Sequence, residues 1–321
     1  MWTHLKYFNH YQSSYKFNTF YLEFPLVIVS TQLHQFLRRF LFSKKLFLRA
    51  LLTDLITYLS LILVMVYFIY LNQFNLDSIF FSFIVAFLLG SIINFSFIFS
   101  LKFNLKNIYH TTINNWVIAK WLLLTSILQW FAGNLWLLNA GIILGPYYLG
   151  IIRACQNLLG VTNIFFQSFE NFTSIQSSQK FIEEGLDQMR AYLKDFTFKF
   201  FILIMIITFF IVLSSEFLLN IFYGDETAGY YHLLILLSLI IPIHFLQYAP
   251  TYGLRTLAHT RPIFIAYLFA SIFAILFSKL VITHFEINGL IFGLYLSQTI
   301  IVSFLYYGYL NKIKQIKKDK S

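Results

Sequence analysis

Long apolar runs alternate with short polar connections along the whole 321-residue chain. Each run reaches or exceeds the roughly 17 to 20 residues that a helix needs to cross the hydrocarbon core of a membrane. The nine runs lie at about 17–36, 49–71, 77–101, 116–145, 147–172, 196–222, 229–250, 262–284 and 287–309. Aromatic residues are spread through the runs rather than placed in alternating ten-residue segments, which favours helices over the strands of a membrane barrel. The pattern therefore predicts an all-α, polytopic transmembrane bundle of about nine spans.

The composition supports this class of protein. Hydrophobic residues make up 59% of the chain and charged residues 11%, and the mean hydropathy is +0.71, which excludes an ordinary soluble domain. The net charge of +10 does not indicate nucleic-acid binding, because the basic residues lie in short loops between apolar spans. The single cysteine, Cys155, excludes an internal disulfide and a cysteine-based metal cluster, and its apolar surroundings predict a packing role.

The basic residues fall in alternate connections, and this sets the expected orientation. The connections at 71–77, 145–150, 223–231 and 283–288 contain no Lys or Arg, whereas the others and the C-terminal tail are basic. Because Lys and Arg accumulate on the cytoplasmic side of membrane proteins, we expect a cytoplasmic C-terminus in an inner or plasma membrane. Nine crossings would then place the N-terminus outside, although it carries Lys6 and Lys16, which suggests that spans are missing ahead of it. The first residues do not have the pattern of a cleavable signal peptide.

The longest connection, 173–195, contains helix-forming residues with charges of both signs. Such a segment is typical of a helix that lies in the headgroup plane. We therefore expect a short, separate amphipathic helix between the fifth and sixth spans.

The span at 147–172 carries polar residues at helical spacing, namely Arg153, Asn157, Gly160, Asn163, Gln167 and Asn171, with Gln156 and Glu170 one position to the side. Steps of three and four place these side chains on one face of one helix. Each would cost several kcal/mol if it faced lipid, so the stripe is predicted to face other helices or a water-filled cavity. Its candidate substrate-binding residues are Arg153, Gln156, Asn157, Asn163 and Gln167.

Arg153 separates two interpretations of this stripe. Glycines and amides also serve to pack membrane helices together. Arg153 lies about five residues, or roughly 7 Å, inside the apolar span, and helix packing needs no permanent cation. A cavity-facing arginine is therefore favoured, and snorkelling to the nearer interface is the alternative.

The preceding span offers two further polar faces. Gln129, Gly133 and Trp136 share one face, and Trp130 and Asn134 share another. Both faces cannot line the same cavity, and the sequence does not choose between them. Gln129 and Asn134 both remain candidate substrate-binding residues, while packing or lipid contact is the alternative for the two tryptophans.

Two residues are candidates for ion coupling. His244 lies between Pro242 and Pro250, and prolines interrupt membrane helices in ways that are common at transporter sites. A histidine titrates near physiological pH, but an interhelical hydrogen bond is the alternative role. Asp54 lies near the cytoplasmic end of its span, where a structural ion pair with Arg38 or Arg39 of the preceding helix is the alternative.

The chain shows no pattern typical of an enzyme. It has no paired carboxylates at helical spacing within a span, no nucleophile elbow, no glycine-rich phosphate loop after a strand and no histidine pair at metal spacing. We therefore expect no enzymatic activity, no metal and no cofactor. A membrane glycosyltransferase or polysaccharide polymerase is the enzymatic alternative, which the short outer loops disfavour.

The run from 116 to 171, which includes ILGPYYLGIIRACQNLLGVTN, resembles the polysaccharide-biosynthesis flippases of the multidrug/oligosaccharidyl-lipid/polysaccharide (MOP) exporter superfamily. In those proteins a span ending in LLGP precedes a helix that reads roughly GxxRAxQNLLGPxN. The stretches 33–45 and 256–270 also resemble parts of that family. Val161 departs from the pattern, since relatives often have proline there, and this puts the kink expected at that position in doubt.

The resemblance implies two lobes of six helices. Residues 1–105 would form an incomplete first lobe of three helices, and residues 106–321 a six-helix second lobe with a basic cytoplasmic tail. The implied function is to move a lipid-linked oligosaccharide or a polysaccharide precursor, such as that of O-antigen, lipopolysaccharide or capsule, across the cell membrane. The implied partners are this lipid-linked sugar, membrane lipids and polysaccharide-assembly proteins. A truncated, non-transporting scaffold of a polysaccharide-assembly complex is the alternative.

Overall fold

The structure, a computed structural model, describes residues 17–44, 46–94 and 105–319, and all the elements in these ranges are helices. The chain divides into unit 1, Met1–Asn104, and unit 2, Leu105–Ser321. The polytopic helical bundle that the sequence predicts is confirmed.

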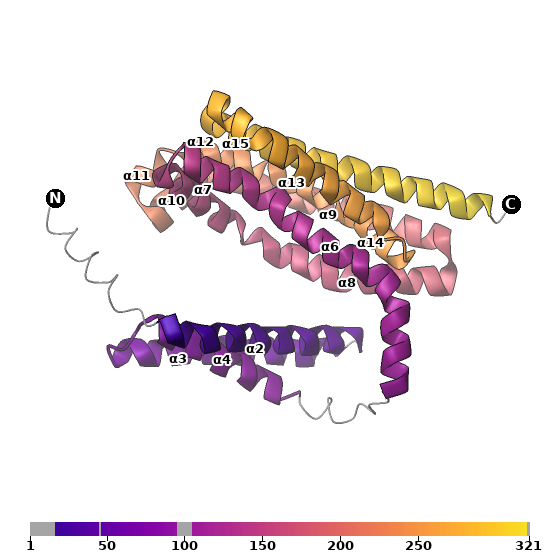
Figure 1. Cartoon of the computed structure of the whole chain (residues 1–321), viewed down its shortest axis with the longest axis horizontal. Coiled ribbons are helices and arrows are strands. Elements are labelled where there is room, and N and C mark those ends of the chain that lie inside the picture. Colours follow the sequence, from indigo (N-terminus) through magenta and orange to yellow (C-terminus); the bar gives the residue numbers. More distant parts are fainter. Residues whose placement is uncertain (1–16, 45, 95–104, 320–321) are drawn as a thin grey trace. The chain divides into compact units, whose positions relative to one another are not determined.

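Unit 1 consists of α2 (Phe17–Ser43), α3 (Phe47–Tyr70) and α4 (Leu76–Ile92), which contact one another (Figure 1). Asn75 begins α4 with a capping box: its side chain accepts from the Ser78 backbone N–H at 2.8 Å, and the Ser78 hydroxyl accepts from the Asn75 N–H at 2.9 Å. At its other end the Asn94 amide donates to the Thr53 hydroxyl at 2.6 Å. The capping box thus stabilises the start of α4, and the hydrogen bond from the Asn94 side chain attaches the end of α4 to α3.

Unit 2 begins with the long helix α6 and ends with a longer one, α15 (Figure 1). Its helices are α6 (Leu105–Ile143), α7 (Pro146–Leu159), α8 (Thr162–Glu184), α9 (Leu186–Leu213), α10 (Ser215–Tyr223), α11 (Asp225–Ala228), α12 (Tyr231–Ser238), α13 (Ile240–Leu246), α14 (Tyr248–Thr256) and α15 (Arg261–Lys318).

The 58 residues of α15 form two antiparallel helical halves. A straight helix of that length would extend roughly 87 Å, far beyond a hydrocarbon core of about 30 Å. Glu286 interrupts it with a non-helical backbone, φ 50° and ψ −130°. The two halves then lie side by side, since a Cβ on Gly308 would lie 2.4 Å from the Cβ of Pro262 and the rings of Phe269 and Phe304 stack at 4.5 Å. The halves, 261–285 and 287–318, match the last two predicted spans.

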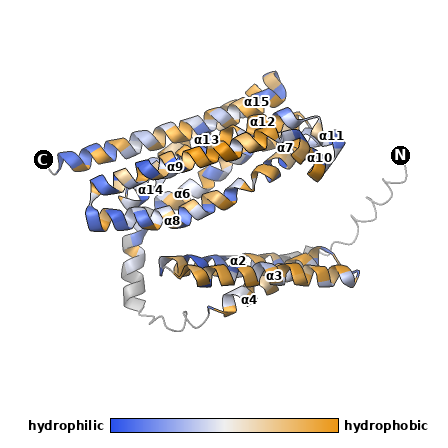
Figure 2. Ribbon diagram, turned by 180° about the vertical axis from the view of Figure 1, so that it is seen from behind, coloured by the Kyte–Doolittle hydropathy of each residue, from blue (hydrophilic) through white to orange (hydrophobic). Residues whose placement is uncertain are grey.

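Five helical stretches of the described chain are long and apolar enough to cross a membrane, or six if the bent pair α7 and α8 counts as one. This count takes α15 once and α12 to α14 as one stretch. The two other predicted spans are α2, whose apolar residues are interrupted by polar ones, and α4, which has 17 residues. Each of the nine predicted spans therefore corresponds to a helix or a broken helix. Hydrophilic residues gather at the end of unit 2 where α8 meets α9 and α15 finishes (Figure 2).

The segment 173–195 is not the separate short helix that the sequence predicted. Residues up to Glu184 continue α8, the chain turns at Gly185 with φ 91°, and α9 starts at Leu186. Contacts with distant parts of unit 2 explain this difference, because the Ser177 hydroxyl lies 3.0 Å from that of Thr256 and Asp187 pairs with Lys317 at 2.8 Å. The mixed charges therefore belong to the tip of a helical hairpin.

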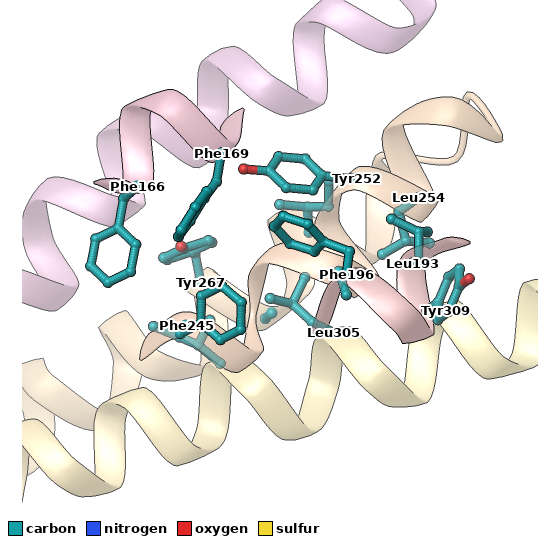
Figure 3. Packing of buried hydrophobic residues seen from close by; sticks show 14 of the residues in the cluster. Phe166, Phe169, Leu193, Phe196, Phe245, Tyr252, Leu254, Tyr267, Leu305 and Tyr309 are labelled. Carbon is teal, nitrogen blue, oxygen red and sulfur yellow. The ribbon is translucent and has the colours of Figure 1, made fainter. Parts of the chain in front are cut away.

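Two apolar clusters hold unit 2 together. In one, the rings of Phe169, Phe196, Phe245 and Tyr252 gather between α8, α9 and the α13–α14 region (Figure 3). In the other, Trp136 of α6 is fully buried and its Nε1 donates to the Ser297 hydroxyl of α15 at 3.0 Å.

The contact of Trp136 with Gly293 gives a stability test. A Cβ on Gly293 would lie 2.1 Å from the indole ring, so Gly293→Ala should lower the free energy of unfolding by about 1–3 kcal/mol through overpacking. Thermal unfolding of the purified protein in detergent measures this. Gly150→Ala is the control, because no atom lies within 4 Å of its added Cβ, and equal Tm values for the two variants would contradict the close packing.

Candidate functional site

The rod formed by α12, α13 and α14 is broken twice. α12 ends at Ser238 and α13 ends at Leu246, and each of these residues lies four positions before a proline, Pro242 and Pro250 respectively. Proline has no N–H to donate to the residue four positions earlier, and its ring collides with that carbonyl. The interruption that the two prolines predict is confirmed.

A buried polar cluster lies at the second break. His244 Nδ1 is 3.3 Å from Gln298 Oε1, and His244 Nε2 is 3.2 Å from Gln247 Nε2. Gln247 Oε1 also accepts from the Tyr267 hydroxyl at 3.1 Å and from Gln298 Nε2 at 3.3 Å. Gln247 is only 6% exposed and Gln298 9%. These bonds join the broken rod to both halves of α15, so the structure places His244 in the interhelical hydrogen bonds expected as its alternative role.

A cavity of about 480 Å³ adjoins this cluster, which is within the size range of ligand pockets, roughly 300–1,000 Å³. It lies at the junction of α7 and α8, where the helix axis bends by 48°. Gly160, Thr162 and Asn163 at this bend line the cavity. The kink that was in doubt is thus present with valine at position 161. Helix α6 contributes Gln129 and Gly133, and α15 contributes Gln298.

A second cavity, of about 260 Å³, extends the polar path toward the basic end of unit 2. It shares Gln129, His244 and Tyr267 with the first. Its other polar wall is an ion pair in which Arg255 donates to Glu170 Oε1 at 3.0 Å. Polar side chains therefore follow one another from the bend of α7 and α8 to this ion pair.

The structure gathers some of the predicted site residues and separates others. Gln129, Gln156, Asn163 and His244 line the cavity of about 480 Å³, which is the larger of these two and is called the larger cavity below. Of the two polar faces of α6, the one with Gln129 therefore lines the cavity. The side-chain amide of Asn134, on the other face, donates a hydrogen bond to the backbone carbonyl of Trp130 in the same helix.

Three of the candidate residues on the stripe, Arg153, Asn157 and Gln167, do not line either cavity. Arg153 is exposed and donates to Gln156 Oε1 at 3.2 Å. The Asn157 amide donates to the Tyr223 hydroxyl at 3.4 Å, and Gln167 is exposed. Arg153 therefore adjoins the larger cavity through its contact with Gln156.

Asp54 belongs to a polar cluster in unit 1. Its Oδ2 lies 3.0 Å from Arg38 Nε, which is one of the two expected pairings, and its Oδ1 lies 3.3 Å from His34 Nε2. The His34 side chain is fully buried, and its Nδ1 lies 3.4 Å from the Thr57 hydroxyl. The cluster ties α2 to α3, as the structural alternative for Asp54 requires.

Sequence reasoning did not select Gln298, Tyr267, Arg255 or His34. Gln298 is a polar side chain inside an apolar run, and that type of residue signals a buried partner. Its partner His244 is 54 positions away, however, and no local spacing identifies such a pair.

No protein-family model and no curated protein matches the chain. Among solved structures it is similar to the outward-facing conformation of a multidrug resistance MATE family transporter of the MOP superfamily, with a TM-score of 0.62 and 13% sequence identity. The similarity covers 85% of this chain and 63% of that transporter. This similarity shows that the two proteins share a fold. The chain spans about 63% of the length of that transporter.

Removing His244 tests the polar cluster. His244→Ala should leave two buried atoms, Gln298 Oε1 and Gln247 Nε2, without the partner that His244 provides, at about 1–3 kcal/mol for each, so thermal unfolding should occur at a clearly lower Tm. His284→Ala is the matched control, because His284 is exposed and lies 2.9 Å from a carbonyl of its own helix. A Tm for His244→Ala that equals that of the control would exclude a stabilising role for the cluster.

Proposed function

We propose that this chain is a membrane transporter of the MOP exporter superfamily that moves a lipid-linked oligosaccharide or polysaccharide precursor across the cell membrane. The fold shared with a MATE family transporter is the observation that carries this proposal. The resemblance of residues 116–171 to the polysaccharide flippases supports the substrate class.

The lining of the larger cavity suits a sugar. Gln129, Gln156, Asn163 and Gln298 each bring an amide, which can donate to and accept from hydroxyl groups at the same time. Phe166 and Tyr267 add aromatic surface beside these amides. Such a mixed wall can hold the hydroxyl groups and the apolar ring faces of an oligosaccharide.

Arg153 is suited to the phosphate part of the substrate. A guanidinium binds two phosphate oxygens through parallel N–H groups, which an ammonium cannot do. Arg153 is exposed and holds Gln156, a residue of the cavity wall, at 3.2 Å. In this proposal the sugars occupy the cavity while the pyrophosphate stays at its edge on Arg153.

The helix breaks provide places where unit 2 can change shape. The bend between α7 and α8 and the break before α13 adjoin the larger cavity, and the break after α13 adjoins the smaller one. Interrupted helices beside a substrate site are a common arrangement in transporters that alternate access. We therefore propose that α7, α8 and α13 move when the cavity switches between opening to one side of the membrane and opening to the other.

A deletion strain tests the function and Arg153 together. Loss of the gene should deplete surface polysaccharide and cause the lipid-linked precursor to accumulate inside the cell. Arg153→Gln should lower transport about tenfold to a hundredfold, as expected for losing charge-assisted hydrogen bonds, while protein abundance stays near wild type. Arg153→Lys should restore part of the activity, and Arg39→Gln, an exposed arginine of unit 1, is the control.

The outcomes of this experiment are distinct. Normal polysaccharide without precursor accumulation in the deletion strain would overturn the transport proposal. Abundance that falls together with activity in Arg153→Gln would assign Arg153 a structural role. Unchanged abundance and unchanged polysaccharide would leave Arg153 as a snorkelling, lipid-facing residue.

The proposed orientation, with a cytoplasmic C-terminus, has its own test. Asp225 of α11 and Asn288, two residues after the interruption of α15, are both exposed, and α11 lies at the end of unit 2 away from its C-terminus (Figure 1). Cysteines at these two positions should react with impermeant thiol reagents from outside the cell. Cysteines at Lys106 and Lys317 should not react. The native Cys155 is fully buried, so the wild-type protein should give little background labelling. Reversed labelling would invert the topology.

A further inference from the structure

A third cavity, of about 580 Å³, opens between α9 and the second half of α15. It shares no lining residue with the two cavities described above. Leu246 and Ala249 of the α12–α14 rod and Tyr306 and Leu310 of α15 also line it. We call it the α9–α15 groove.

The lining of the α9–α15 groove is divided between a charged end and an apolar end. Asp187, Arg190 and Lys194 lie at the start of α9, and Phe198 and Phe201 lie further along the same helix. Eleven positions separate Arg190 from Phe201, or roughly 16 Å along the helix. This separation suits a molecule with an ionic head and a long apolar chain.

The charged end carries an excess of positive charge. Asp187 is shared between Lys317, at 2.8 Å, and Arg190, at 3.5 Å, and Lys194 is a further cation in the lining of the groove. Lys194 is exposed and makes no ion pair with any residue that the structure describes. The nearby Asp195 is paired with Lys199 at 2.7 Å and does not line the groove. A phosphodiester would complement this end.

The position of the groove along the membrane normal is the one that a phospholipid site requires. Its charged end lies where the hydrophilic residues of unit 2 gather, beside the basic tail of α15 (Figure 2). The apolar part of α9, which is the most hydrophobic of the candidate spans, begins beyond it. Cationic side chains would therefore lie at the level of the lipid headgroups, and the phenylalanines would lie in the hydrocarbon.

We propose that the α9–α15 groove binds an anionic phospholipid of the surrounding bilayer. Its phosphate lies between Arg190 and Lys194, and one acyl chain lies along Phe198, Phe201 and Tyr306. This site is separate from the proposed transport cavity, so its occupancy can be measured without a transported substrate.

Lipid binding to the full-length protein in detergent tests this proposal by native mass spectrometry. Phosphatidylglycerol should bind at least tenfold more tightly than phosphatidylcholine with the same acyl chains. The double variant Arg190→Gln with Lys194→Gln should weaken phosphatidylglycerol binding about tenfold to thirtyfold. Lys180→Gln with Lys199→Gln removes the same charge from residues outside the groove and should leave binding unchanged.

A second variant tests whether the space inside the groove is needed for binding. Ala191 is exposed and lines the groove, so Ala191→Phe should fill it and weaken phosphatidylglycerol binding several-fold with no change in charge. Equal affinity for the two lipids, or equal losses in the Arg190/Lys194 and Lys180/Lys199 variants, would overturn the proposal. Displacement of the lipid by inorganic phosphate, with Ala191→Phe unaffected, would show an anion site alone and would also overturn it. Since Lys194 is exposed, Lys194→Gln by itself keeps the test valid if the double variant fails to fold.

Discussion

The structure of unit 2 depends on one constraint: a polar group inside hydrocarbon must find its hydrogen-bond partner within the protein. Hydroxyl groups meet it locally, as when Thr125 and Thr197 donate to carbonyls four residues earlier in their own helices. The histidine and the glutamines of the broken rod need partners on other helices. The contacts of His244 and Gln247 with Gln298 therefore do more than satisfy these groups, because they attach the rod to α15.

The same constraint explains which parts of the fold the sequence could predict. An apolar run long enough to cross a bilayer must be helical, so the nine runs located the helices and the polar stretch around Glu286 located the turn of α15. The breaks of the α12–α14 rod were predictable because Pro242 and Pro250 cannot donate a backbone hydrogen bond. The hairpin at Gly185 was not predictable. Its mixed charges suit a surface helix equally well, and only contacts from residues far along the chain, such as Lys317 to Asp187, decide between the two.

The candidate site was predictable only in part, because periodicity relates a side chain to its own helix axis and not to its neighbours. The spacing of the stripe on 147–172 predicts one straight face. The bend of 48° after Leu159 divides it, and Gln156 before the bend and Asn163 after it both line the cavity. Asn157, which is next to Gln156 on α7, instead bonds to Tyr223 on α10. The bend occurs at a glycine and a valine, without the proline that would have signalled it. The roles of Tyr267 and Gln298 could not be predicted from periodicity, because their hydrogen-bond partners lie tens of residues away in the sequence.

Stability alone does not account for a polar cluster at this place. A buried set of hydrogen-bonded polar groups is often no more stabilising than apolar side chains of the same shape. Here the cluster lies on the wall of the larger cavity and holds a rod that is already broken on both sides of α13. If sugars occupy the cavity as proposed, their hydroxyl groups compete with His244 for the amide of Gln298. Substrate binding and the attachment of α13 to α15 then use hydrogen bonds to the same atoms of Gln298. Occupancy of the cavity is therefore linked to the position of the rod.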